Sequence, residues 1–189
     1  MISEAANRYI LVHTSTVSDI MANIIILNAA ARKNGNTAAL VEAFMKGAKE
    51  SGNTVKEFYL QTMTIRGCLA CMGCTRNAEP CAQKDEMTQI YEAFKDCDTV
   101  VMSSPVYFYG VAGPLKTTVD RLFAVFSKYG YEACQRDCAL LMTSDDPEFD
   151  EPLDWYRKFA DNMGWNNLGE VLGSGRVQEA HDLGASIGH

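Results

Sequence analysis

The segment from Asn23 to Ser51 changes its hydrophobic period once, and this change limits what the chain can fold into. Residues 24–27 form a short unbroken apolar run, which is typical of a strand buried on both faces of a parallel sheet. After a polar loop, apolar side chains recur at helical spacing at Leu40, Val41, Phe44, Met45 and Ala48. The segment therefore predicts a strand, a loop and a helix, the opening of an α/β fold.

The loop between this strand and helix has the composition of an anion site. Arg32 supplies positive charge and Asn34 a polar side chain, while Gly35 lets backbone N–H groups turn inward. Asn36 or Thr37 is expected to cap the helix. Neither the dinucleotide nor the nucleoside-triphosphate glycine motif occurs, so the expected guest is the phosphate of a mononucleotide. The alternative is an ordinary capped turn that binds nothing.

Further strands and helices alternate along the chain. Expected strands are residues 54–60, 99–103, 138–143 and 167–172, with helical patterns between them. Five strands joined by right-handed crossovers predict a doubly wound parallel sheet of order 2-1-3-4-5. Residues 21–189 are expected to form this one domain, and residues 1–20 an N-terminal arm or tail.

In this strand order, the loops after the first, third and fourth strands meet at one edge of the sheet, where a ligand is expected. The fourth strand leads into Thr143 and Ser144. The third leads into an aromatic loop that offers a flat ring a stacking face: Pro105, Val106, Tyr107, Phe108, Tyr109 and Gly110. A phosphate site beside a stacking face indicates FMN. The alternative is that these aromatics cover the sheet edge or form a subunit contact.

Four motifs resemble those of the flavodoxin-like NAD(P)H-dependent FMN reductases, and most closely the iron-sulfur flavoprotein branch. They are residues 28–37, 104–110 and 113–116 and the pair Asp120 and Arg121. The resemblance implies that Arg32, Asn34, Asn36 and Thr37 bind the FMN phosphate and that the isoalloxazine lies against residues 105–110. One departure is the run Ala29, Ala30 and Ala31, where the family usually has a hydroxyl that meets the phosphate.

Four of the seven cysteines cluster in one loop, at Cys68, Cys71, Cys74 and Cys81. Thiolates at this spacing suit a [4Fe-4S] cluster, which is expected near the flavin edge. A structural zinc site and a loop of free or air-oxidised thiols are the alternatives. The other three, Cys97, Cys134 and Cys138, are expected to be buried as small apolar residues.

Composition excludes several classes. The net charge of −7 disfavours nucleic acid and anionic membranes as partners, and no apolar run has the length of a membrane span. The total of seven cysteines is odd, four of them cluster, and residues 1–20 are not expected to be a signal peptide, which together indicate a reducing, cytoplasmic setting. The three histidines lie near the chain ends, so a hydrolase triad is not expected.

Two functions remain. The first is an enzyme that uses FMN to pass electrons from NAD(P)H to a quinone, a flavin, a nitro or azo compound, or a metal. Its chemistry is borne by the flavin, so no catalytic side chain is assigned. The second is a non-enzymatic carrier of single electrons between the cluster and a redox protein. A homodimer or homotetramer is expected, because the aromatic loop with Phe123 and Phe126 offers exposed apolar surface.

Overall fold

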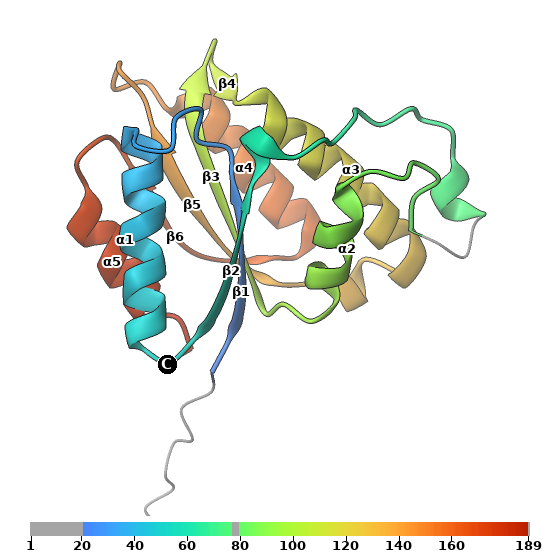
Figure 1. Ribbon diagram of the computed structural model, residues 1–189, viewed down its shortest axis with the longest axis horizontal. Helices are drawn as coiled ribbons and strands as arrows, with labels where there is room; N and C mark the ends of the chain where they lie inside the picture. Colours follow the sequence, from blue (N-terminus) through green and yellow to red (C-terminus); the bar gives the residue numbers. More distant parts are fainter. Residues whose placement is uncertain (1–20, 77–79, 189) are drawn as a thin grey trace, which may run out of the picture.

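The computed structural model describes residues 21–76 and 80–188, and the expected N-terminal arm lies outside them. Five parallel strands form one sheet (Figure 1): β1 Asn23–Asn28, β2 Thr54–Tyr59, β3 Thr99–Tyr107, β5 Asp137–Thr143 and β6 Asn166–Leu172. Their order is β2-β1-β3-β5-β6. The predicted α/β fold and the 2-1-3-4-5 order of parallel strands are therefore confirmed.

One further strand was not predicted. β3 does not end at residue 103 but continues to Tyr107, where it turns back into the short antiparallel β4 Gly110–Val111. Pro105 does not interrupt β3, which pairs with β5 as far as Thr143. The segment expected to be an aromatic loop is thus the tip of a β-hairpin.

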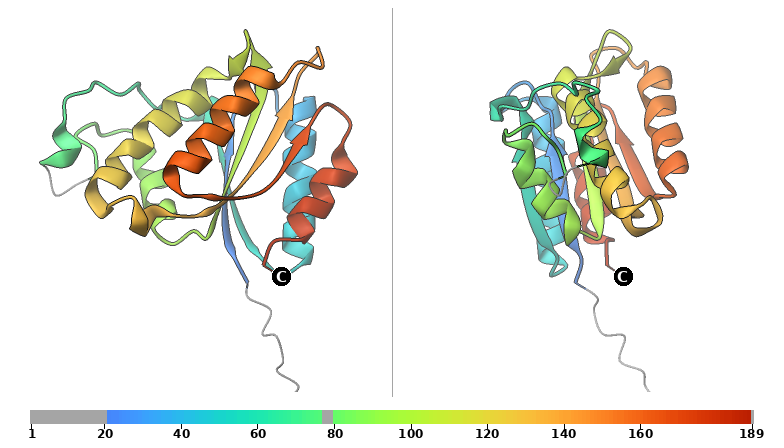
Figure 2. Two further views of the ribbon diagram at one scale, coloured as in Figure 1. Left: turned by 180° about the vertical axis from the view of Figure 1, so that it is seen from behind. Right: turned by 90° about the vertical axis from the view of Figure 1, so that its right-hand side faces the viewer.

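Helices cover both faces of the sheet, as two views of the ribbon show (Figure 2). One face is covered by α1 Asn36–Glu50 and α5 Val177–Ala185. The other is covered by α2 Met87–Lys95, α3 Gly113–Tyr129 and α4 Asp150–Met163. Three 3₁₀ turns, Leu60–Thr62, Gly73–Thr75 and Glu132–Cys134, complete the described elements, and no helix among them is long and apolar enough to cross a membrane.

β1 lies inside the sheet, between β2 and β3. Ile24 and Ile26 point into the core beneath α1 and α5, while Ile25 and Leu27 point into the core beneath α2, α3 and α4. A strand with both faces covered has no polar face to present, which is why the apolar run identified it.

α1 and α5 touch backbone to backbone. A methyl group on Gly47 would lie 2.0 Å from the carbonyl oxygen of His181, and one on Gly184 would lie 2.2 Å from that of Phe44. Each glycine is therefore needed for close approach rather than for its backbone angles. This contact fixes α1, whose first turn faces the ligand edge of the sheet.

Candidate functional site

α1 begins without a side-chain cap, contrary to the prediction for Asn36 or Thr37. Its N-cap residue is Gly35, and no side chain bonds to the first turn. The backbone N–H groups of Asn36, Thr37 and Ala38 have no partner among the described residues, since an α-helix leaves its first donors unpaired. Unpaired donors and the positive end of the helix dipole together favour an anion.

Gly35 has a different role from the one expected. Its φ of −94° is open to any residue, so it does not supply a left-handed turn. Instead, its N–H donates to the carbonyl of Arg32 at 3.2 Å, and a side-chain carbon would come within 3.3 Å of that same oxygen. The tight turn of residues 32–35 is what Gly35 permits.

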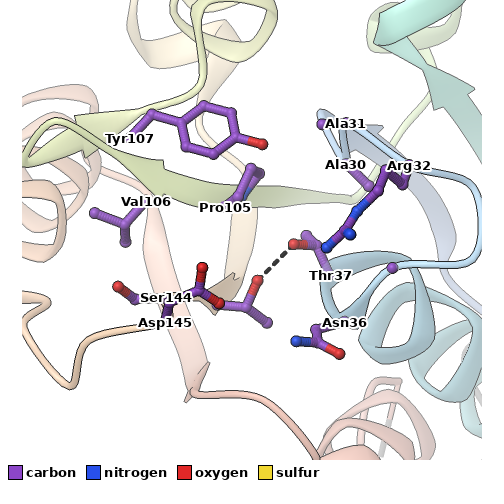
Figure 3. Close-up of a pocket in the computed structure, with 12 residues that line it drawn as sticks. Ala30, Ala31, Arg32, Asn36, Thr37, Pro105, Val106, Tyr107, Ser144 and Asp145 are labelled. Atoms are coloured by element: carbon purple, nitrogen blue, oxygen red, sulfur yellow. Dashed lines mark hydrogen bonds between the residues drawn. The ribbon is translucent and has the colours of Figure 1, made fainter.

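The three loops predicted to meet do meet, around one cavity of about 90 Å³ (Figure 3). Its lining comes from the loops after β1, β3 and β5: Ala30, Ala31, Arg32, Gly35, Asn36, Thr37, Pro105, Val106, Tyr107, Thr143, Ser144 and Asp145. Since one water occupies about 30 Å³ of liquid, the cavity admits a phosphate-sized group but not a flavin ring. A flavin bound here would have to lay its ring over the outer surface.

Two buried hydroxyls close the inner end of this cavity. Thr37 on α1 and Thr143 at the end of β5 are hydrogen-bonded to each other at 2.5 Å, although 106 positions separate them. In such a pair, one hydroxyl donates and the other keeps its own O–H free. One donor therefore remains for an anion in the cavity.

Charge in the cavity is mixed. The guanidinium of Arg32 has no hydrogen-bond partner among the described residues, whereas the exposed Asp145 brings a negative charge to the opposite wall. The N–H of Ala30 is already taken by the side chain of Asn28 at 2.9 Å. In a loop that lacks the family's usual hydroxyl, Arg32 and the first turn of α1 are thus the main donors left for a phosphate.

Four predicted residues lie outside the cavity lining: Asn34, Phe108, Tyr109 and Gly110. For these and for the predicted residues that do line the cavity, contact with a flavin stays a prediction. Three lining residues were not predicted as site residues: Ala30, Ala31 and Asp145. Ala30 and Ala31 have no side-chain chemistry to reveal them, and the acidic loop around Asp145 was the one available signal.

The hairpin tip is strained. Phe108 and Tyr109 have φ of 48° and 62°, the left-handed values that a two-residue hairpin turn requires. Asparagine and glycine normally occupy such positions, and a bulky residue there costs on the order of 1–2 kcal/mol. Phe108 is also fully exposed, so no burial offsets this cost within one chain. Strain of this kind clusters at binding sites.

Replacing Phe108 and Tyr109 with asparagine and glycine should raise the free energy of unfolding by about 1–2 kcal/mol. The replacement relieves both left-handed residues and gives up little buried surface. Urea denaturation of the two proteins measures the difference. A less stable variant would mean that the aromatic side chains are packed in the folded protein.

The four clustered cysteines line a second cavity, of about 250 Å³, together with residues 120, 121, 123 and 124 of α3. It shares no lining residue with the first cavity. Along α3, it lies about seven to eleven residues from the hairpin end of the helix, roughly 10–17 Å at the usual rise. Within one chain, the cysteine cavity therefore does not lie at the flavin edge, where the cluster was expected.

Four cysteines line one mostly apolar space, and thiolates are the ligands that an iron-sulfur cluster takes. Within residues 21–76 and 80–188, however, no three potential ligands are close enough to hold a metal. The cysteines are therefore not arranged as a preformed zinc or iron-sulfur site in this structure. Ala70 and Met72 have left-handed φ values of 51° and 54°, so the chain between the cysteines is strained.

A buried ion pair lies beneath this loop. The guanidinium of Arg121 donates to both carboxylate oxygens of Asp85, at 2.9 and 3.1 Å, and both side chains are at most 2% exposed. Burial disfavours the charged form of Asp85, but hydrogen bonds from Arg121 and from two backbone N–H groups outweigh it and hold its pKa below the ordinary 3.8. Burial raises the pKa of nearby Tyr91, which keeps its hydroxyl protonated.

The ionisation of Asp85 should make the stability of the fold depend on pH. Its pKa is lower in the folded state, so the ionised carboxylate stabilises the fold above its ordinary value, and this contribution is lost as the pH falls through the folded value. Asp85→Asn should therefore be less stable than the parent at neutral pH, with the difference shrinking below about pH 4. Chemical denaturation at several pH values tests this, and a difference independent of pH would contradict it.

The remaining three cysteines are buried, as predicted. Burial raises the pKa of Cys97 to about 11 and also raises the pKa of Cys134 and of Cys138. Thiols held protonated are poor nucleophiles and poor metal ligands. Phe126 is buried too, contrary to the expectation that it adds to an exposed surface, whereas Phe123 is 40% exposed.

The sequence matches a family model and several known proteins. A family model described as NADPH-dependent FMN reductase matches residues 22–167. An iron-sulfur flavoprotein of Archaeoglobus fulgidus is 32% identical over 91 residues, 48% of this chain and 41% of that protein. Another, of Methanocaldococcus jannaschii, is 39% identical over 80 residues, 42% of this chain and 40% of that protein. The matches thus span less than half the length of these relatives.

Solved structures share the fold. An NAD(P)H:quinone oxidoreductase from Methanothermobacter marburgensis has a TM-score of 0.68 at 18% identity, covering 89% of this chain and 98% of that chain. An FMN-dependent NADH-azoreductase from Bacillus anthracis, in complex with FMN, has a TM-score of 0.61 at 14% identity, covering 89% and 100%. At these identities, the likeness establishes the fold alone.

Proposed function

Because the chain belongs to the NADPH-dependent FMN reductase family, we propose that it binds FMN at the edge where three loops meet and oxidises NAD(P)H. One observation supports this most directly: an uncapped helix, an arginine whose guanidinium has no partner in the described part of the chain, and two buried hydroxyls surround a phosphate-sized cavity. This cavity lies at the switch point of a doubly wound sheet, where such folds bind ligands.

The residues divide into two groups. Arg32, the first turn of α1 and the Thr37–Thr143 pair would bind the phosphate, since each offers a donor to the cavity. Pro105 and Tyr107 line the β3 side of this cavity and would form the surface against which the ring lies. When bound, FMN supplies the hydride and electron chemistry, so the protein binds and orients the reactants without a catalytic acid or base.

Ser104 makes this surface rigid. Its hydroxyl donates to the carbonyl of Pro105 at 2.7 Å and accepts the N–H of Ala112 at 2.8 Å, which ties β3 to the start of α3. The ring would therefore meet a fixed backbone rather than a mobile loop, which lowers the ordering cost of binding.

The electron acceptor is proposed to be a small molecule: a quinone, a flavin, a nitro or azo compound, or a metal. A quinone oxidoreductase and an azoreductase are among the structures of this fold. The exposed hairpin tip, with Tyr107 at 51%, Phe108 at 100% and Tyr109 at 66% exposure, favours a homodimer or homotetramer that covers it.

The test is direct. The purified protein should bind about one FMN per chain, measured by flavin fluorescence quenching, and the loaded protein should oxidise NADH or NADPH in the presence of a quinone. A protein that takes up no FMN would overturn the proposal. A protein that binds FMN but does not oxidise either nucleotide would favour an electron carrier instead.

The carrier alternative depends on the cysteine cavity. Four thiols lining one space, and relatives described as iron-sulfur flavoproteins, support a [4Fe-4S] cluster held by Cys68, Cys71, Cys74 and Cys81. Such a cluster would supply one-electron chemistry when bound.

Cys71→Ser should lose the iron while keeping FMN, because it removes one cluster ligand and no residue of the phosphate cavity. After anaerobic reconstitution, the parent should contain about four iron and four sulfide per chain. Cys97→Ser, at a buried cysteine outside the loop, is the control and should keep its iron. Zinc without sulfide in the parent would indicate a structural site instead.

A further inference from the structure

The phosphate loop, residues 29–35 between β1 and α1, begins with a turn that one side chain makes. Asn28 ends β1, between Tyr59 of β2 and Ser103 of β3, and is only 3% exposed. The oxygen of its side-chain amide accepts the N–H of Ala30, two residues ahead, at 2.9 Å. Such an Asx turn takes the place of a backbone turn. The path by which the chain leaves the sheet for the phosphate cavity therefore depends on Asn28.

The other end of the Asn28 amide is held by Glu57 of β2. The amide nitrogen, Nδ2, donates to a carboxylate oxygen of Glu57 at 2.6 Å. A hydrogen bond to a carboxylate is shorter, and roughly twice as strong, as one between neutral groups. Glu57 is exposed whereas Asn28 is buried, so this contact joins an interior side chain to the surface of the molecule.

These two partners permit only one orientation of the amide. An amide has an acceptor at one end and donors at the other, whereas a carboxylate only accepts. Because Glu57 takes the NH₂ group, the carbonyl oxygen of Asn28 is left facing the N–H of Ala30. Turning the amide over would bring donors together at Ala30 and acceptors together at Glu57. Glu57 therefore selects the orientation on which the turn depends.

Neither of these two side chains lines the phosphate cavity. Ala30 and Arg32 line it, on the same wall (Figure 3). Asn28 and Glu57 instead line a separate groove of about 710 Å³, formed mainly by α1 and β2, which shares no lining residue with the phosphate cavity. Apart from the effect of its charge, Glu57 can therefore influence a bound phosphate only through Asn28 and the loop.

We propose that Asn28 and Glu57 are positioning residues for the phosphate of FMN. Glu57 orients the amide of Asn28, and this amide holds the N–H of Ala30. The turn in this way sets where Arg32, two residues later, meets the cavity. The inference rests on the proposed FMN site.

The decisive variant is Glu57→Lys, because charge alone makes the opposite prediction for it. Replacing a negative side chain by a positive one near the phosphate loop would, by charge, tighten the binding of FMN. A lysine only donates, however, so it would attract the carbonyl end of the Asn28 amide and turn the NH₂ group toward Ala30. The turn would be lost, and we expect FMN to bind about tenfold more weakly, the scale of one lost hydrogen bond.

Adding Asn28→Asp to Glu57→Lys should rescue the binding of FMN. The new carboxylate can accept from the lysine at one oxygen and from the N–H of Ala30 at the other, so the turn forms again with donor and acceptor exchanged. By charge alone, the added carboxylate would weaken FMN binding further. We expect the double variant to bind FMN more tightly than Glu57→Lys alone.

Glu42→Lys is the matched control. Glu42 is exposed, lines the same groove and has no hydrogen-bond partner in the described part of the chain, so its substitution makes the same change of charge and leaves the turn intact. FMN affinity should stay the same or rise. Riboflavin, which has the flavin ring but no phosphate, is the second control. Its affinity should be equal for Glu57→Lys and the parent, and flavin fluorescence quenching measures both ligands.

The outcomes separate this role from the proposed function. If the parent binds FMN and Glu57→Lys binds it as tightly or more tightly, the positioning role is overturned. Equal losses of FMN and riboflavin affinity, or a folded double variant without recovery, overturn it as well. If the double variant does not fold, Glu57→Lys against Glu42→Lys decides alone. If the parent takes up no FMN, the proposed function is overturned, and this role with it.

Discussion

Gly47→Ala is expected to destabilise the protein by about 2 kcal/mol or more, although alanine is the better helix former. The added methyl group would lie 2.0 Å from the carbonyl oxygen of His181 and 3.0 Å from the backbone nitrogen of Ala185. Both neighbours are backbone atoms of α5, so no side chain can rotate away. The helices must separate, and the contact that they make with the sheet must loosen.

Thermal unfolding measures this effect, and a loss of about 2 kcal/mol should lower the midpoint by roughly 4–8 °C for a chain of this size. Gly113→Ala is the matched control, because a methyl group there meets nothing within 4 Å. Gly113 begins α3, so this substitution should be neutral or slightly stabilising. Equal midpoints for the two variants would show that α5 can move away from α1 at little cost.

The same contact explains why α5 was not predicted. Its buried residues include Ala180 and Gly184, small side chains that hydrophobic periodicity does not register. A helix that packs by bringing its backbone against glycine needs no large apolar face. By contrast, β1 and α1 were found because their cores are built from isoleucine, leucine and phenylalanine.

The hairpin was missed for a related reason. A two-residue turn is normally signalled by asparagine and glycine, and Phe108 and Tyr109 give the opposite signal. Pro105 within β3 also suggested that the strand had ended. A strained turn that breaks local rules is not predictable from local preference, and such departures tend to occur where a ligand or a partner binds.

Part of the candidate site could be predicted because parallel strands bring their loops to one edge, so strand order alone brought Arg32 and Thr143 together. The detailed contacts of the site could not be predicted from the sequence. The hydroxyl pair of Thr37 and Thr143 joins residues 106 positions apart. The buried pair of Arg121 and Asp85 runs against the strong tendency of charged residues to stay exposed.

Arg32→Ala should weaken FMN binding by about 1–3 kcal/mol, or roughly 5- to 150-fold, the loss expected for a charge-assisted hydrogen bond to a phosphate. The guanidinium of Arg32 has no hydrogen-bond partner among the described residues, so its removal should change affinity and leave the fold intact. FMN titration followed by fluorescence, with the midpoint of thermal unfolding beside it, measures both.

The neighbouring lysine provides the control. Lys33 lies one residue away and has the same charge, yet its Nζ sits 5.7 Å from the ring centroid of Tyr59 and it lines a different cavity. Lys33→Ala should therefore change FMN affinity much less than Arg32→Ala. If both substitutions weaken binding equally, the loop acts only through its overall charge, and the phosphate is not seated against Arg32.

A substitution of Asp145, on the opposite wall of the cavity, tests the same phosphate position. Its carboxylate lines the space opposite Arg32 and repels an anion placed between them. Asp145→Asn keeps the shape of the side chain and removes the charge, so FMN should bind more tightly, with the gain fading as salt is raised. Weaker binding after both substitutions would place the phosphate elsewhere. Opposite changes from two facing residues require a negative group between them, which is what a phosphate in this cavity would be.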